Sequence, residues 1–144
     1  MVEFESALIA PRRGQEAAVA ARLGRELPAM GRFTEADGMR LIRTAPHQVL
    51  AMREGTGLFA GLEAALAGVA GVFDLSDARV GLVMTGERLR RLAPVDLRAL
   101  GPGGCAQTLV EQLGVLILQR DATTYEVHCP ASYRASFERA LGGH

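Results

Sequence analysis

The chain repeats one order of secondary structure in its two halves: a strand, a helix, two strands and a second helix. Apolar residues recur at helical spacing in four segments. These sets are Val19, Leu23 and Leu27; Leu58, Leu62, Leu66 and Val69; Leu89 and Leu92; and Tyr133, Phe137 and Leu141. Apolar or alternating runs typical of strands lie between them, at 1–10, 39–44, 48–53, 72–74, 80–84, 115–118 and 125–129. This order predicts a split β-α-β-β-α plan used twice in a single domain, with residues 1–77 and 78–144 as its two units.

The strands are expected to form a curved, mainly antiparallel sheet with the helices on one side, which is an α+β fold. The run at 115–118 is continuously apolar and indicates a central strand covered on both faces. In the last strand, Tyr125 and Val127 face one side, while Glu126 and His128 face the other. We expect His128 to point outward.

The sequence also predicts where several elements begin and end. The first helix is expected to run from about Gln15 until Pro28 stops it. Thr56 is a plausible N-cap of the second helix, and a third helix is expected to start after Thr85. Residues 29–38 are expected to be an irregular loop.

Length and charge exclude several classes of protein. A chain of 144 residues buries enough surface to fold without a disulfide or a metal. Its 16 basic and 16 acidic residues balance, which removes the general attraction to phosphate used by nucleic-acid and membrane-surface proteins. No segment approaches the roughly 20 apolar residues that a membrane span needs. Glu3 and Glu5 argue against a signal peptide, and Cys105 and Cys129 lack metal-ligand spacing, so a cytoplasmic location is expected.

One glycine-rich segment has the order expected of a nucleotide-binding loop. Gly55, Gly57 and Gly61 follow a strand and open a helix, and Asp74 ends the next strand. The glycine spacing differs by one residue from the usual form, and the preceding strand is edged with polar residues. A turn before a small helix is therefore the simpler interpretation, and we expect no cofactor in this chain.

The remaining polar candidates also favour structural roles. His47, His128 and His144 have no partner at catalytic or metal-ligand spacing. Arg88, Arg90 and Arg91 fan over a helix face, which indicates a solvated surface or, alternatively, an ion-pairing patch for an acidic partner. The acids most suggestive of a site are Asp74, Asp77 and Asp96. Asp96 is more simply explained by the helix end that Pro94 enforces.

Four motifs in the second half carry a resemblance to a known family. They are V-F-D-L-S-D-A-R-V-G-L-V-M-T-G-E-R-L-R-R-L at 72–92, P-V-D-L at 94–97, G-G-C-A-Q-T-L at 103–109 and P-A-S-Y-R-A-S-F at 130–137. In pattern and order the chain resembles the gamma subunit of heterotetrameric sarcosine oxidase. That family is similar to the folate-binding domain of glycine-cleavage aminomethyltransferases. The matched positions are Asp77, Arg79, Gly86, Pro94, Asp96, Leu97, Gly104, Thr108, Ser132, Tyr133 and Phe137.

The resemblance implies a folate-binding-domain-like fold and a non-catalytic accessory subunit with no cofactor of its own. The complex would demethylate sarcosine to glycine by oxidation and pass the one-carbon unit to tetrahydrofolate. The resemblance places FAD, FMN, NAD and tetrahydrofolate in larger partner subunits, and it gives the matched residues structural or interface roles. Two alternatives remain: a free-standing folate-binding or one-carbon-transfer protein, and a cytosolic homodimer without sarcosine chemistry.

Overall fold

The computed structural model describes residues 1–92, 97, 100–110 and 112–142, with the backbone alone described at 76 and 77. Pro94 and Asp96 therefore lie outside the described residues. The chain divides into two compact units. The N-terminal unit is Phe4–Ser76, and the C-terminal unit is Asp77–His144 together with Met1–Glu3.

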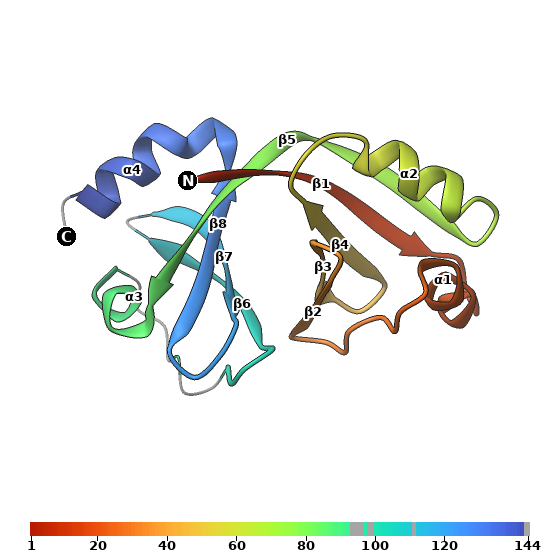
Figure 1. Cartoon of the computed structure of the whole chain (residues 1–144), viewed down its shortest axis with the longest axis horizontal. Coiled ribbons are helices and arrows are strands. Elements are labelled where there is room, and N and C mark those ends of the chain that lie inside the picture. Colours follow the sequence, from red (N-terminus) through yellow and green to blue (C-terminus); the bar gives the residue numbers. More distant parts are fainter. Residues whose placement is uncertain (93–96, 98–99, 111, 143–144) are drawn as a thin grey trace. The chain divides into compact units, whose positions relative to one another are not determined.

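The N-terminal unit is an antiparallel sheet with two helices (Figure 1). Its elements are β1 (Val2–Pro11), α1 (Glu16–Leu23), β2 (Arg32–Ala36), β3 (Met39–Ala45), β4 (Gln48–Arg53), α2 (Leu58–Ala65) and the first part of β5 (Ala70–Thr85). The strand order is β2-β3-β4-β1-β5. The β1–β4, β2–β3 and β3–β4 pairs are antiparallel, and the β3–β4 register shifts between Ile42 and Ala45.

The C-terminal unit uses the remainder of β5 and repeats the pattern (Figure 1). Its other elements are α3 (Gly86–Leu92), β6 (Cys105–Val110), β7 (Leu113–Gln119), β8 (Thr124–Pro130), the short 3₁₀ helix η2 (Ala131–Tyr133) and α4 (Arg134–Gly142). The strand order is β5-β8-β7-β6, with antiparallel pairing at every step. The predicted α+β fold with a mainly antiparallel sheet is confirmed.

Each unit has its own apolar core, in which helices cover one face of the strands. In the N-terminal unit, α1 and α2 contribute Val19, Leu58 and Leu62, which pack with residues of β1, β3 and β4. In the C-terminal unit, α3 and α4 contribute Leu89, Leu92, Phe137 and Ala140, which pack with residues of β5 to β8. The continuous run at 115–118 is buried throughout, as a strand covered on both faces should be.

Two helix ends differ from the sequence prediction because backbone geometry at glycine sets them. Helix α1 ends at Leu23, five residues before Pro28, and its C-cap residue Gly24 has φ of 69°. The amides of Gly24 and Arg25 donate to the carbonyls of Ala21 and Ala20, which is a Schellman cap. The N-cap position of α2 is occupied by Gly57, which has φ of 87°, and not by Thr56 as predicted.

Helix α3 starts after Thr85, as predicted, and Thr85 caps it. Its Oγ1 accepts a hydrogen bond from the Arg88 amide at 3.3 Å, so one of the amides that lack a partner within the helix is satisfied.

The predicted irregular loop at 29–38 is wrong, because half of it, Arg32–Ala36, forms strand β2. Ala36 pairs with Met39, so β2 and β3 are joined by the two residues Asp37 and Gly38. Both have positive φ, 53° and 75°, as a type I′ hairpin turn requires.

The two short strands predicted at 72–74 and 80–84 form one strand, β5, of 16 residues. No helix in the described part of the chain is long and apolar enough to cross a membrane.

Candidate functional site

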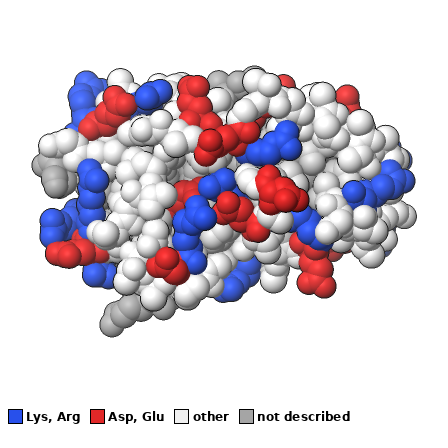
Figure 2. Space-filling view, viewed as in Figure 1, with Lys and Arg blue, Asp and Glu red and all other residues white. Residues whose placement is uncertain are grey.

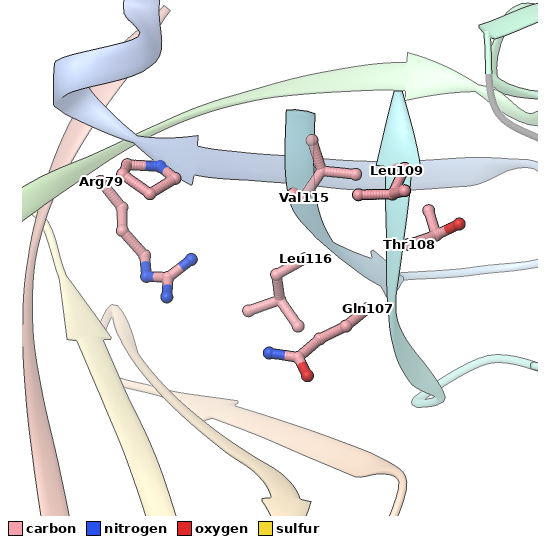
Figure 3. A pocket seen from close by; sticks show the side chains of 8 residues that line it. Arg79, Gln107, Thr108, Leu109, Val115 and Leu116 are labelled. Carbon is pink, nitrogen blue, oxygen red and sulfur yellow. The ribbon is translucent and has the colours of Figure 1, made fainter. Parts of the chain in front are cut away.

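A groove in the C-terminal unit, here called the Arg79 groove, gathers two of the family-matched residues. It has a volume of about 440 Å³ and is lined by Arg79, Gln107, Thr108, Leu109, Gly114, Val115, Leu116 and Pro130. The Arg79 guanidinium, the Gln107 amide and the Leu116 side chain extend toward the same space in Figure 3. Two of the matched positions, Arg79 and Thr108, thus lie in one groove.

Strand register brings these residues together. Arg79 of β5 pairs with Pro130 of β8, and Gln107 of β6 pairs with Leu116 of β7. Leu116 in turn pairs with His128 of β8. Because cross-strand partners share a face of the sheet, Gln107, Leu116 and His128 form one row across three strands.

Burial dominates the electrostatics of this groove. It lowers the pKa of Arg79 from its ordinary value, and the nearby Cys129 opposes this shift. Burial also raises the pKa of the Cys129 thiol to about 11, against the effect of Arg79. Cys129 is therefore a neutral thiol at pH 7 and does not balance the charge of Arg79.

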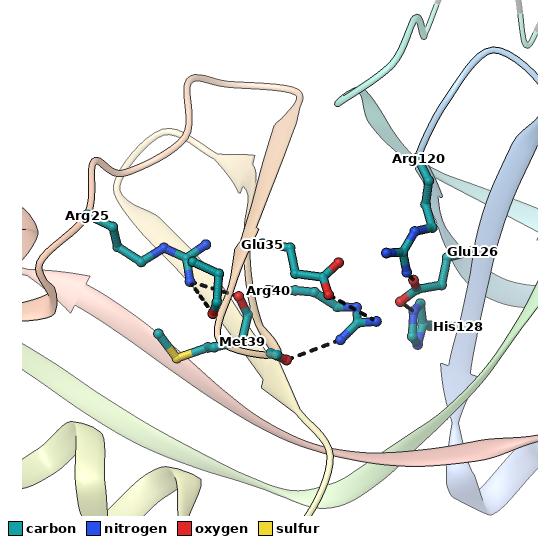
Figure 4. Close-up of polar contacts among 9 residues, drawn as sticks. Arg25, Glu35, Met39, Arg40, Arg120, Glu126 and His128 are labelled. Atoms are coloured by element: carbon teal, nitrogen blue, oxygen red, sulfur yellow. Dashed lines mark hydrogen bonds and ion pairs between the residues drawn. The ribbon is translucent and has the colours of Figure 1, made fainter.

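A second polar arrangement, the Glu126 network, consists of Glu126 and His128 of strand β8 and Arg120 of the β7–β8 connection. His128 Nε2 is 2.5 Å from Glu126 Oε1, and Arg120 Nη1 donates to Glu126 Oε2 at 2.8 Å (Figure 4). The His128 side chain is fully buried, and that of Glu126 is 3% exposed. The expectation that His128 points outward is wrong.

A glycine makes room for the buried imidazole. Gly81 of β5 pairs with His128, and a Cβ at position 81 would lie 2.4 Å from His128 Nδ1 and Cε1. Any side chain at Gly81 would collide with the ring. A glycine inside a strand is a known sign of such close approach, and this signal was available in the sequence.

The Glu126 network is suited to structure rather than to catalysis. A histidine and a carboxylate can act together as a general base only if the imidazole reaches a substrate. His128 is fully buried, whereas Arg120, at the other end of the network, is 37% exposed. The network therefore ties the β7–β8 connection to the buried face of β8.

In the N-terminal unit, arginines bind backbone carbonyls and so hold segments together. Arg25 donates to Met39 O at 2.8 Å and to Thr34 Oγ1 at 2.7 Å, which fixes the β2–β3 hairpin against the segment after α1. Burial lowers the pKa of Arg25, opposed by Asp37 and Glu35. Arg40 forms an ion pair with Glu35 at 3.9 Å (Figure 4).

The other matched residues are dispersed over the C-terminal unit. Gly86 opens α3 where a Cβ would lie 2.9 Å from the Tyr125 ring, and at Gly104 a Cβ would lie 2.4 Å from Leu100 O. Leu97 and Phe137 belong to the core. Ser132 and Tyr133 are exposed on η2, and Asp77 lies in β5.

The remaining polar candidates are not among the residues that line the Arg79 groove. Gly55 and Gly57 have positive φ in the turn before α2, and Asp74 is exposed on β5. His47 is exposed in the β3–β4 turn, and His144 is outside the described residues. Among the residues that are described, no group of three or more His, Cys, Asp or Glu could hold a metal ion.

Arg88, Arg90 and Arg91 are exposed on α3, and Arg91 pairs with Glu87 at 2.7 Å. Positive and negative groups are interspersed on the face of the molecule shown in Figure 2. This mixture fits the solvated-surface interpretation of the arginine cluster.

Comparison with known proteins places the fold. No protein-family model matches the chain, and no curated protein matches it. Among solved structures, it is similar to a chain of heterotetrameric sarcosine oxidase from Corynebacterium sp. U-96, determined in complex with pyrrole 2-carboxylate. The TM-score is 0.80 at 25% identity, and the match covers 98% of this chain and 78% of that chain.

A second solved structure has the same fold at lower similarity. It is glycine cleavage system aminomethyltransferase T from Bartonella henselae, with a TM-score of 0.68 and 16% identity. The match covers 96% of this chain and 43% of that chain. Both neighbours agree with the resemblance drawn from the motifs: the chain has a fold found in heterotetrameric sarcosine oxidase and in part of an aminomethyltransferase.

Proposed function

We propose that this chain is a non-catalytic subunit of an oxidase complex that demethylates sarcosine or a similar N-methyl amino acid. The observation that carries the proposal is the match, over 98% of the chain, to a chain of heterotetrameric sarcosine oxidase. On this proposal the complex forms glycine and passes the one-carbon unit to tetrahydrofolate. FAD, FMN, NAD and tetrahydrofolate belong to the larger subunits.

The polar groups of the chain support a structural role within such a complex. Its buried imidazole and carboxylate are bound to each other at 2.5 Å, and the imidazole is inaccessible to a substrate. In the N-terminal unit, Arg22 donates to the backbone carbonyl of Ala65 and Arg25 to that of Met39. The subunit would act by stabilising or positioning its partners, because a protein that binds the native state stabilises it.

Co-expression tests the proposal directly. The full chain would be produced with the flavoprotein subunits of a heterotetrameric sarcosine oxidase, with an affinity tag on this chain alone. We expect the subunits to elute together from size-exclusion chromatography and to reduce their flavin on addition of sarcosine. A tagged chain that elutes without the flavoproteins, under conditions in which those proteins are folded, would contradict the proposal.

The two alternative functions give different results in the same preparation. A free-standing folate-binding protein would bind 5-formyltetrahydrofolate in calorimetry when purified alone. A homodimer would show twice the chain mass in light scattering and keep that mass when flavoproteins are added. On the proposed function, the isolated chain is colourless and binds neither FAD nor NAD in the same titrations.

A further inference from the structure

The Arg79 groove has the features of a ligand site that the proposed function does not use. Its volume of about 440 Å³ lies within the roughly 300 to 1,000 Å³ typical of small-molecule sites. Its residues come from four strands of one unit, β5, β6, β7 and β8. A site built on paired strands holds its side chains in fixed positions.

The groove holds a cation without a balancing anion among the described residues. Within that part of the chain, Cys129 is the titratable group that acts on the pKa of Arg79. Cys129 is a neutral thiol at pH 7. A partly buried guanidinium gains most from a carboxylate, which it binds through two parallel hydrogen bonds.

The other residues of the groove restrict what the anion can be. Gln107 and Thr108 offer an amide and a hydroxyl, whereas Leu109, Val115, Leu116 and Pro130 offer apolar surface. Leu109 is 55% exposed, so its side chain presents apolar surface to a molecule in the groove. One cation with two neutral polar groups suits a monoanion, and the apolar surface suits a ring or a branched chain.

A glycine keeps the groove open. A Cβ built at Gly114 meets no atom within 4 Å, and the backbone there is not in the left-handed region. A larger side chain would therefore fit the strand and occupy the groove. A leucine at position 114 can therefore fill the groove without backbone strain.

We propose that the Arg79 groove binds a small carboxylate that carries an apolar ring or branched chain. Arg79 binds the carboxylate, Gln107 and Thr108 orient it, and the apolar body lies over Leu109 and Leu116. All the lining residues belong to this chain, so binding is tested on the isolated chain.

The test is an amide NMR titration of the ¹⁵N-labelled full chain with benzoate and with 3-methylbutanoate. Benzamide, which has the same shape as benzoate without its charge, is the control ligand. We expect saturable shifts at residues 107–109 and 114–116 with the carboxylates. Benzamide should bind at least about tenfold more weakly, because it lacks the charge-assisted pair.

Two variants and two matched controls locate the site. Arg79→Gln should weaken benzoate binding at least about tenfold, whereas Arg88→Gln, which removes an exposed arginine on α3, should not. Gly114→Leu should abolish binding by filling the groove. Gly61→Leu adds the same side chain at another open position, on α2, and should leave binding unchanged.

Several results would overturn the proposal. These are the absence of saturable shifts with both carboxylates, equal binding of benzoate and benzamide, and binding that survives in Arg79→Gln or Gly114→Leu. Binding of an acidic peptide without binding of either free carboxylate would also overturn it, in favour of a protein partner. If Arg79→Gln does not fold, Gly114→Leu with the benzoate and benzamide pair decides.

Discussion

At the scale of single residues, the C-terminal unit depends on an imidazole packed against a strand backbone. His128 fills the space that Gly81 leaves and is bound to Glu126 at 2.5 Å. Removing one member of a buried charged or hydrogen-bonded group leaves the other without compensation, which costs more than the interaction itself is worth. Position 81 and position 128 are therefore expected to be strongly coupled.

A double-mutant cycle measures this coupling. Gly81→Ala alone should destabilise the protein by about 1 to 3 kcal/mol, because its Cβ would collide with the His128 ring. His128→Ala alone should cost about 3 to 5 kcal/mol, because Glu126 loses a partner in a buried position. In the His128→Ala background, Gly81→Ala should cost almost nothing. Urea unfolding of the four proteins gives these values, and additive effects of the two substitutions would disprove the packing described.

The raised pKa of Cys129 predicts a loss of folding stability at high pH. Its pKa is raised by burial to about 11 from 9.0, so the unfolded chain loses this proton at a lower pH than the folded protein. The stabilisation is complete below pH 9.0 and is lost as the pH rises toward about 11. The loss should be on the order of 2 kcal/mol. Unfolding measured against pH should show a shallower alkaline decline in Cys129→Ala, and an identical decline would contradict the assignment.

His128 shows why the burial of a single residue is hard to predict from sequence. Strand alternation correctly placed His128 opposite Tyr125 and Val127. Alternation gives the face of a strand but not whether that face is buried. Gly81, a residue without a side chain in a strand, was the available sign that a large group approaches there. The Arg79 groove combines residues 79, 107–109, 114–116 and 130, which only the strand register brings together.

At the scale of elements, apolar periodicity predicted the helices and most strands, while glycine geometry determined their ends. Gly24 ends α1 before Pro28 can, and Gly57 replaces Thr56 at the start of α2. The residues A-D-G-M at 36–39 carry the Asp-Gly pair typical of a two-residue hairpin. The strand before that pair, β2, has four of its five residues exposed, so it lacked the apolar signal of a strand.

Two glycine substitutions with opposite outcomes test this account. Gly38→Ala should destabilise the protein by about 1 to 2 kcal/mol, because the hairpin turn requires φ of 75°. Gly61→Ala should stabilise it by about 0.5 to 1 kcal/mol, because Gly61 lies in helix α2 with open space around its Cβ position. Urea midpoints at equal slope give both values. A stabilising Gly38→Ala would show that the hairpin turn is different in solution.

At the scale of the whole molecule, the fold is shared by proteins with different roles, so the fold alone does not decide the function. The match to a sarcosine oxidase chain covers 78% of that chain, whereas the match to the aminomethyltransferase covers 43% of it. The chain therefore corresponds to most of the first chain and to less than half of the second. What the sequence left open is the surface through which the proposed subunit would act.

Tyr133 is a matched residue whose exposed position the packing of this chain does not explain. It is 51% exposed on η2, whereas the matched residue Phe137, on the adjoining helix α4, is fully buried. Exposed tyrosines are enriched among the residues that dominate binding at protein interfaces. On the proposed function, Tyr133 therefore contacts a partner subunit.

Tyr133→Ala should weaken assembly with the flavoprotein subunits at least about tenfold and leave the stability of the isolated chain almost unchanged. Phe73→Ala removes another exposed aromatic residue, 55% exposed on β5, and serves as the control because its position is not among the matched ones. Assembly would be measured by analytical ultracentrifugation of the co-expressed subunits, and chemistry by stopped-flow reduction of flavin with sarcosine.

Once a saturating concentration of the Tyr133→Ala chain restores the complex, flavin reduction should proceed at the wild-type rate, because an accessory subunit supplies no group to the chemical step. A fully assembled Tyr133→Ala complex that reduces its flavin many times more slowly would instead place this chain in the active site.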